Sequence, residues 1–318
     1  MLKKLISEKG LILAEGAVIE RIKREFKFEL NEYIANADMI YDVVGKKILE
    51  KICNQYISVA FRFNLPIIIL TPTWRASQER LELAGFREKN VNADCFNFLS
   101  EIRKNYGNYA EKIIIGGIIG CKGDAYNPEE ALSSEEAYTF HKFQVKALAE
   151  AGVDFLMGTT LPASSEALGI AKAMAESSIN YILSFVVRPN GILLDGKTLN
   201  DTISVIDNSV SPKPLFYMLN CIHPIHCRSA INNELNNTDL VRMRLLGVQA
   251  NGSIKSPEEL ELLDKVDSDK PSLWGKKMID LYLFSNIKIL GGCCGTNHHH
   301  IKIIAKNFKK IEKNLIKK

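Results

Sequence analysis

Two short segments of the sequence carry cysteines at positions that could bind a metal ion. Residues 291–296 read Gly-Gly-Cys-Cys-Gly-Thr, which places Cys293 and Cys294 side by side between glycines, and Cys221 follows Asn220 much earlier in the chain. Glycine permits the tight turns that let neighbouring side chains point at one target. Thiolates are soft ligands that suit zinc, and three protein ligands with a fourth position open are typical of catalytic zinc sites. The residue types therefore predict a zinc site formed by Cys221, Cys293 and Cys294.

The charge of such a site indicates which chemistry it favours. Three thiolates on Zn²⁺ give a net charge of about −1, which makes the ion a poor Lewis acid for water. The open position can still bind an incoming thiol and keep it deprotonated. The pattern therefore favours activation of a sulfur nucleophile over hydrolysis.

Other interpretations of these residues stay open from the sequence. The glycine-rich turn can be an ordinary loop, and a lone cysteine after a strand, such as Cys221, is usually a small core residue. His223 and His226 are second choices as metal ligands. The histidines at 298–300 are expected to begin the last helix, where only one of three consecutive side chains can face a common site. Cys53, Cys95 and Cys227 are interpreted as structural, and no role is assigned to Cys121.

The elements that must position these side chains recur along the whole chain as short apolar runs separated by amphipathic stretches. Almost uniformly apolar runs are typical of strands buried on both faces, and their alternation with helices predicts a parallel sheet. Eight such runs predict a single-domain (β/α)8 barrel over residues 1–318, with functional side chains just after the strands. The strands are expected at 11–14, 66–70, 113–119, 153–157, 181–187, 215–219, 245–248 and 287–290.

Local signals differ in strength along the chain. The weakest strand is 245–248, which two arginines precede, and the clearest helix is 133–151. Ser133 or Ser134 can cap that helix, and Gly152 can end it. An open doubly wound sheet is the rival fold, but no Gly-x-Gly-x-x-Gly motif follows the first apolar run.

Composition excludes several classes of protein. The chain has 318 residues, of which 46% are hydrophobic and 25% charged, with a net charge of +4, so it is not predicted to bind nucleic acid. No apolar run is long enough for a membrane span or a signal peptide, which predicts a cytoplasmic protein without a membrane partner. The 7 scattered cysteines argue against a disulfide scaffold. Nothing in the sequence sets the oligomeric state.

The two cysteine motifs resemble those of the homocysteine S-methyltransferases, zinc-dependent barrels that include betaine-, S-methylmethionine- and methylfolate-using enzymes. The resemblance implies that Cys221, Cys293 and Cys294 hold zinc and that an acceptor thiol enters as fourth ligand. That thiol would attack the methyl group of a sulfonium or ammonium donor, in methionine biosynthesis. The donor is expected to be a free small molecule, because the chain ends soon after the eighth strand. Less specific similarity covers residues 71–77, 120–126 and 140–154.

The resemblance also implies a set of substrate-binding residues, and some differ from the family pattern. Glu15-Gly16 stands where the family has Asp-Gly, and its carboxylate can still receive the ammonium group of an amino-acid acceptor. Thr159 stands where the family has a glutamate that contacts the amino acid, so a charge-assisted contact of roughly 1.5–3 kcal/mol is lost. Trp74 can attract a cationic donor or simply pack in its loop. Asn220 completes the expected set.

Three functions remain open from the sequence. The first is zinc-dependent methyl transfer to the thiol of homocysteine or a close relative. The second is the same zinc site acting on a different thiol or a selenol, which the exchange at Thr159 motivates. The third is a non-catalytic zinc- or redox-sensing barrel, in which Cys293 and Cys294 cycle between thiol and disulfide.

Overall fold

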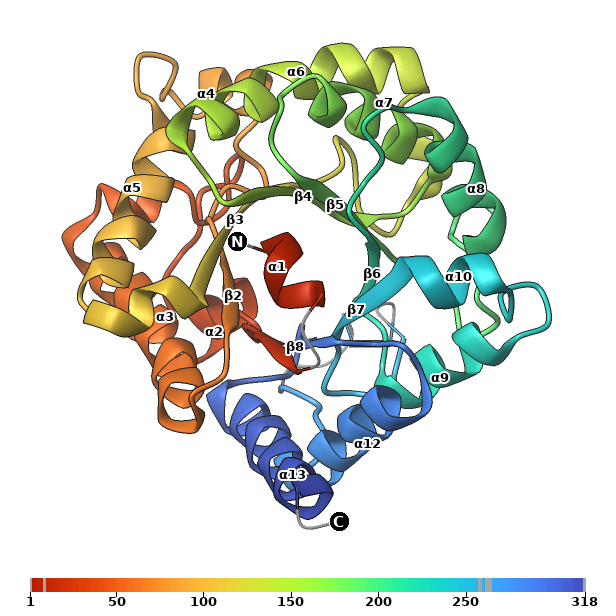
Figure 1. The fold of residues 1–318 in the computed structure, drawn as a ribbon. Coiled ribbons are helices and arrows are strands. Elements are labelled where there is room, and N and C mark those ends of the chain that lie inside the picture. Colours follow the sequence, from red (N-terminus) through yellow and green to blue (C-terminus); the bar gives the residue numbers. More distant parts are fainter. Residues whose placement is uncertain (1, 8–9, 257–258, 261–264, 317–318) are drawn as a thin grey trace.

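The protein is a closed barrel of parallel strands surrounded by helices (Figure 1). The computed structural model describes residues 2–7, 10–256, 259–260 and 265–316. Within that part of the chain, each strand pairs with the next one along the sequence, and the eighth pairs with the first. The predicted (β/α)8 barrel is therefore confirmed. The strands are β1 (Ile12–Ala14), β2 (Ile67–Leu70), β3 (Ile113–Ile119), β4 (Phe155–Leu161), β5 (Tyr181–Phe185), β6 (Tyr217–Asn220), β7 (Leu245–Ala250) and β8 (Ile289–Gly292).

Strand bounds agree closely with the sequence prediction except in β4. This strand continues to Leu161, whereas the apolar run predicts an end at residue 157. The prediction of a loop from residue 158 is wrong because threonine is β-branched and pairs well in a sheet. The register with β5 shifts between Gly158 and Leu161, and Thr160 has a φ of 57° at this irregularity. Thr159 consequently lies inside a strand rather than after one.

Helices connect the strands on the outside of the barrel (Figure 1). The helix predicted at 133–151 is confirmed: Ser133 forms a capping box with Glu136, and Gly152 ends the helix at a φ of 91°. The described helices are α1 (Leu2–Ser7), α2 (Ile19–Arg24), α3 (Val43–Phe63), α4 (Gln78–Leu83), α5 (Val91–Lys104), α6 (Ser134–Ala151), α7 (Ser164–Ala175), α8 (Leu199–Ser209), α9 (Pro224–Asn232), α10 (Asp239–Arg244), α12 (Pro271–Phe284) and α13 (His298–Ile316), with 3-10 turns at Asp38–Ile40, Gly107–Lys112 and Pro128–Glu130.

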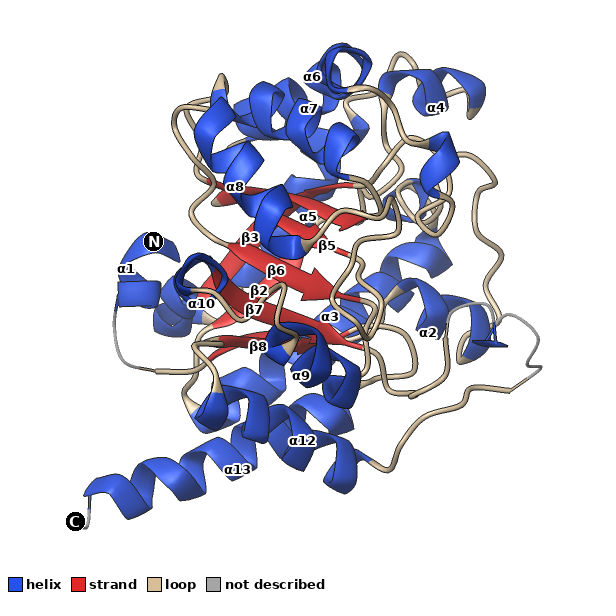
Figure 2. Cartoon of the chain, turned by 90° about the vertical axis from the view of Figure 1, so that its right-hand side faces the viewer, coloured by secondary structure: helices blue, strands red, loops and turns tan. Residues whose placement is uncertain are grey.

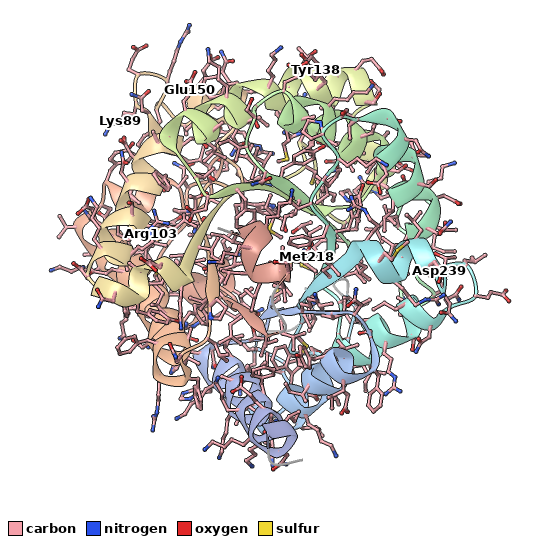
Figure 3. The ribbon with its side chains drawn as sticks, in the orientation of Figure 1. Lys89, Arg103, Tyr138, Glu150, Met218 and Asp239 are labelled. Atoms are coloured by element: carbon pink, nitrogen blue, oxygen red, sulfur yellow. The ribbon has the colours of Figure 1, made fainter. Side chains whose placement is uncertain are left out.

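Alternate strand residues separate an inner from an outer core. Phe155, Met218 and Ile289 belong to the cluster inside the barrel, while the intervening residues pack against the surrounding helices. Figure 3 shows Met218 within the ring of strands and Asp239 on the helical rim. In the described residues, no helix is both long and apolar enough to cross a membrane.

The first helix closes one end of the barrel. Figures 1 and 2 show α1 lying across the amino-terminal ends of the strands, and Leu2, which is 1% exposed, packs against the inner cluster. The loops that follow the strands gather at the opposite end (Figure 2). Any site built from strand ends must therefore open at that carboxyl-terminal face.

Candidate active site

A cavity of about 440 Å³ opens at the carboxyl-terminal ends of the strands. Its size suits small-molecule substrates, and in a barrel of this kind this face carries the chemistry. Every residue that the sequence assigned to the site lines it: Glu15, Gly16, Trp74, Thr159, Asn220, Cys221, Cys293 and Cys294.

Cys221 brings its sulfur to the second cysteine motif through an unusual backbone conformation. It directly follows β6 and has a φ of 56°, in the left-handed region that few residues other than glycine adopt. Its Sγ lies 3.0 Å from the Sγ of Cys293 and accepts a hydrogen bond of 3.2 Å from Nδ2 of Asn220. The structure thus unites the two cysteine motifs at one point.

Backbone hydrogen bonds fix the loop that carries the adjacent cysteines. The amide of Cys293 donates to the carbonyl of Ala250 at 2.8 Å, and the hydroxyl of Thr296 donates to the carbonyl of Cys293 at 2.7 Å. Gly295 has a φ of 77°, and its amide donates to the carboxylate of Glu20. The glycines permit the turn that the sequence predicted.

The sulfurs of the two cysteine motifs influence one another's ionisation. Cys221 contacts Cys293, and Cys293, followed by Cys294, lowers the pKa of Cys221 well below its usual value. Tyr126 and Asn220 lower it further, and Nδ2 of Asn220 donates a hydrogen bond to this sulfur. The contacts with Cys221, together with burial, raise the pKa of both Cys293 and Cys294. Cys221 is therefore favoured as the thiolate of the group.

The donor set of this cluster fits zinc. With Zn–S bonds of about 2.3 Å, tetrahedral zinc separates two sulfurs by about 3.8 Å. The observed 3.0 Å between Cys221 and Cys293 is shorter, so the two sulfurs have to move apart by less than about 1 Å. In the described residues, no three His, Cys, Asp or Glu side chains stand at metal-binding spacing. The ligand chemistry suits zinc, and the present spacing is that of a contracted thiol cluster.

Glu15 supplies a buried carboxyl group to another wall of the cavity. It follows β1, is 8% exposed, and accepts a hydrogen bond of 3.3 Å from the amide of Leu70. Burial raises the pKa of Glu15 to about 8, against the lowering effect of that bond. A side chain on Gly16 would come within 2.9 Å of the hydroxyls of Tyr56 and Thr296, which explains the glycine.

Asn220, which donates to the Cys221 sulfur, is itself held by a network of hydrogen bonds at the carboxyl-terminal end of the barrel. Its Oδ1 accepts hydrogen bonds from the hydroxyl of Ser184 at 2.6 Å and the amide of Thr160 at 3.1 Å. Its Nδ2 donates to the hydroxyl of Thr160 at 2.8 Å, and the Thr159 hydroxyl lies 3.5 Å from Oδ1. The amide is thus committed to orienting Cys221, and Thr159 belongs to the same network.

Comparison with known proteins identifies the family. A sequence model described as homocysteine S-methyltransferase matches residues 12–308. The chain belongs to the homocysteine S-methyltransferase family. It is therefore a methyltransferase, and membership supports methyl transfer to a thiol as its class of reaction.

Curated relatives agree with this assignment. Homocysteine S-methyltransferase YbgG of Bacillus subtilis is 23% identical over 313 residues, which are 93% of each chain. The homocysteine S-methyltransferase of Escherichia coli is 27% identical over 203 residues, 59% of this methyltransferase and 60% of its own length. Selenocysteine methyltransferase of Astragalus bisulcatus is 25% identical over 281 residues, 75% of this chain and 77% of its own.

Solved structures share the fold. The metallated form of the homocysteine methyltransferase MmuM from Escherichia coli superposes with a TM-score of 0.75 at 19% identity, over 96% of this methyltransferase and 98% of that chain. Its oxidized form gives a TM-score of 0.76 at 19% identity, over 95% and 97%.

The second-choice ligands of the methyltransferase do not join the sulfur cluster. His223 contacts Asp269 at 3.2 Å and accepts from the amide of Ile225, while Nε2 of His226 contacts the carbonyl of Ile254 at 3.1 Å. Neither histidine lines the cavity. The histidine run begins α13, as predicted.

The other cysteines divide into two groups. Cys95, Cys121 and Cys227 are buried and lie outside the cavity lining. Cys53, interpreted from the sequence as structural, does line the cavity, and burial raises its pKa well above the usual value, with the nearby Glu15 carboxyl adding to the effect. No local sequence pattern indicates this position, because α3 comes close to the site only in the folded protein.

Sequence reasoning missed several polar residues that line the cavity. Tyr126 lies in the segment after β3, and Gln249 and Asn251 lie at the end of β7. The rule that side chains after a barrel strand carry function would have indicated the last two. Trp74, which was predicted, lies under the guanidinium of Arg75, 4.3 Å from its ring centre.

Proposed function

We propose that this methyltransferase transfers a methyl group from a free small-molecule donor to the thiol of homocysteine or a close relative, at a zinc ion held by Cys221, Cys293 and Cys294. The observation that carries the proposal is the 3.0 Å approach of the Cys221 and Cys293 sulfurs from positions 72 residues apart. Family membership supports a thiol as the methyl acceptor.

The zinc ion and the cavity residues would have separate roles in the reaction. Zinc, when bound, would let the acceptor thiol react as a thiolate at neutral pH. A bond then forms between that sulfur and the methyl carbon as the bond from the carbon to the donor's nitrogen or sulfur breaks. The protein contributes alignment, which is a large part of catalysis for such a displacement. Asn220 fixes the position of Cys221, and the ring of Trp74 offers a surface that attracts a cationic donor.

Glu15 would bind the ammonium group of the acceptor. Its raised pKa of about 8 means that the carboxyl is mostly protonated at neutral pH before the acceptor binds. An ammonium group beside it favours the carboxylate, so acceptor binding releases a proton. Thr159 offers only a hydroxyl where the family has a second carboxylate.

A metal analysis of the purified protein tests the zinc proposal most directly. We expect about one zinc per chain, and Cys293→Ser should lower zinc affinity more than about a hundredfold and abolish methyl transfer. Cys227→Ala, which alters a buried cysteine outside the cavity, should keep its zinc. One zinc per chain in purified Cys293→Ser would show that the ligand assignment is wrong.

A second candidate is transfer to a different small thiol or a selenol, and the uncharged Thr159 favours it. Equal kcat/KM values for homocysteine and for thiols without an amino-acid group would support this candidate. Reversible zinc release on oxidation, with no transfer from any sulfonium, ammonium or folate donor, would instead support the zinc- or redox-sensing barrel. A cytoplasmic location and a place in methionine biosynthesis stay predictions.

A further inference from the structure

Gln249 lies in the cavity on β7, between the two strands, β6 and β8, that the cysteines follow. On β7 it pairs with Asn220 of β6 and Gly291 of β8. Those two residues lie two positions beyond Met218 and Ile289, which belong to the cluster inside the barrel. Because strand side chains alternate between faces and paired residues share one, Gln249 also points into the barrel. It lines the cavity and is 7% exposed.

The carboxamide of Gln249 forms no hydrogen bond with any residue that the structure describes. The amide of the neighbouring Asn220, in contrast, is bonded through both its oxygen and its nitrogen. Buried amides almost always have partners, because leaving one without destabilises the fold. A polar side chain on a cavity floor that lacks an internal partner is suited to bind a ligand.

The surroundings of Gln249 indicate the kind of group that it would bind. Cys221 follows the strand on one side, and Cys293 and Cys294 follow the strand on the other. Under the proposed function, three thiolates on one zinc ion carry a net charge of about −1 beside the carboxamide, which favours a cationic N–H donor over a carboxylate.

We propose that Oε1 of Gln249 accepts a hydrogen bond from the ammonium group of the acceptor thiol. Gln249 is then a specificity-determining residue that, with Glu15, replaces the carboxylate missing at Thr159. This inference rests on the proposed function, because it takes the acceptor to be a thiol that carries an amino acid. It also explains how a site with one buried carboxyl group can select such an acceptor.

The test compares two thiols that differ only in the ammonium group. Calorimetric binding to the zinc-loaded protein is measured for homocysteine and for 4-sulfanylbutanoate, in which hydrogen replaces the ammonium. Wild-type protein should bind homocysteine more tightly. Gln249→Met, which has nearly the same shape, should reduce that preference by about tenfold or more, and the Kd of 4-sulfanylbutanoate should change less than about threefold. Gln249→Glu should retain the preference, because a carboxylate also accepts from ammonium.

A matched control separates this contact from a general loss of stability. Gln55 on α3 lies outside the cavity and accepts a hydrogen bond of 2.7 Å from Arg21. Gln55→Met makes the same chemical change and should leave the preference unaltered.

Three outcomes would overturn the inference. An unchanged preference in Gln249→Met would remove Gln249 from the acceptor site, and the proposed function would stand. A loss of homocysteine affinity in Gln249→Glu as large as in Gln249→Met would show that the contact is not with the ammonium. If wild-type protein bound neither thiol, the proposed function would fail and this inference with it.

Discussion

Two surfaces of the cavity differ in how their polar groups are hydrogen-bonded. We call the surface formed by Asn220, Cys221, Gln249, Cys293 and Cys294 the sulfur half. The apolar half is the adjoining surface, formed by Glu15, Leu49, Leu70, Phe98 and Ile118, and it meets the sulfur half where β1 pairs with β8. In the sulfur half, Cys221 is hydrogen-bonded to both Asn220 and Cys293. In the apolar half, Glu15 is a buried carboxyl group with a single bond to the amide of Leu70.

The two halves therefore differ in when their interactions form. The sulfur half has its hydrogen bonds before substrates bind, whereas we expect Glu15 to gain its charge partner only from a bound substrate. Under the proposed function, the hydrogen bonds of the sulfur half hold Cys221 close to Cys293 before the metal and substrates bind, which lowers the cost of assembling a reactive geometry. The raised pKa of Glu15 shows that burial disfavours its charged form more than the hydrogen bond from Leu70 favours it. Mutations in the sulfur half should therefore affect metal binding and turnover, whereas mutations in the apolar half should affect acceptor affinity and pH dependence.

The largest effect is expected from Cys221→Ser. Loss of one thiolate from three should lower zinc affinity more than about a hundredfold and reduce methyl transfer to background. Competition with a chromogenic zinc chelator measures the affinity, and Cys95→Ala, at a buried cysteine outside the cavity, provides the control. Full activity of Cys221→Ser would show that the sulfur half does not control metal binding and turnover.

Glu15→Gln should remove a pH dependence of stability. The pKa of Glu15 is raised from 4.5 to about 8 on folding, so its contribution is fully present below pH 4.5 and is lost as pH rises through 8. At about 1.4 kcal/mol per pKa unit, wild type should lose up to about 4–5 kcal/mol between these limits. Denaturant titrations of both proteins at pH 5 and pH 9 measure this difference.

The same variant tests the role of Glu15 in acceptor binding. The KM for homocysteine should rise about tenfold or more at pH 9, where wild type has the carboxylate, with a smaller change in kcat. The stability profile of wild type should also flatten when homocysteine is saturating. Equal pH profiles for the two free proteins would mean that the carboxyl of Glu15 is not buried in solution.

Asn220→Ala should affect the sulfur half indirectly. It removes the donor to the Cys221 sulfur and leaves the amide of Thr160 and the hydroxyl of Ser184 without their acceptor. We expect a loss of about 1–3 kcal/mol in the free energy of unfolding, because buried groups lose their hydrogen-bond partner. Zinc affinity should weaken by about 10–100-fold, as is typical when a residue that hydrogen-bonds to a metal ligand is removed. Ser184→Ala, which removes only one donor, should have a smaller effect on both measurements.

Ser133→Ala, outside both halves of the cavity, should lower stability without affecting catalysis. Loss of the capping box at the start of α6 should cost about 1 kcal/mol of stability. Because this cap lies outside the cavity lining, kcat and KM should remain within about twofold of wild type. A large change in KM would mean that α6 and the barrel mouth are coupled.

The sequence predicted the parts of the molecule that depend on local pattern. Buried parallel strands are short apolar runs, and the Gly-Gly-Cys-Cys-Gly-Thr segment follows one of them, so the barrel and the convergence of Cys221 with Cys293 could be derived. The end of β4 was mispredicted because Thr159 and Thr160 are polar yet favour strand geometry.

Other features depend on what surrounds a side chain, and local patterns do not contain them. The pKa of Glu15 is raised by burial among residues from several elements. Gln249 lacks a side-chain partner among the described residues, and Cys53 reaches the cavity from the middle of α3. Each of these properties becomes visible only when distant segments are placed together.

The position of α1 has a practical consequence for handling the enzyme. This helix closes the barrel at the end opposite the cavity, with Leu2 packed against the inner core (Figure 2). A resin or sensor surface coupled to the chain beside α1 would leave the cavity entrance facing bulk solution, so immobilised enzyme should retain free exchange of its ligands.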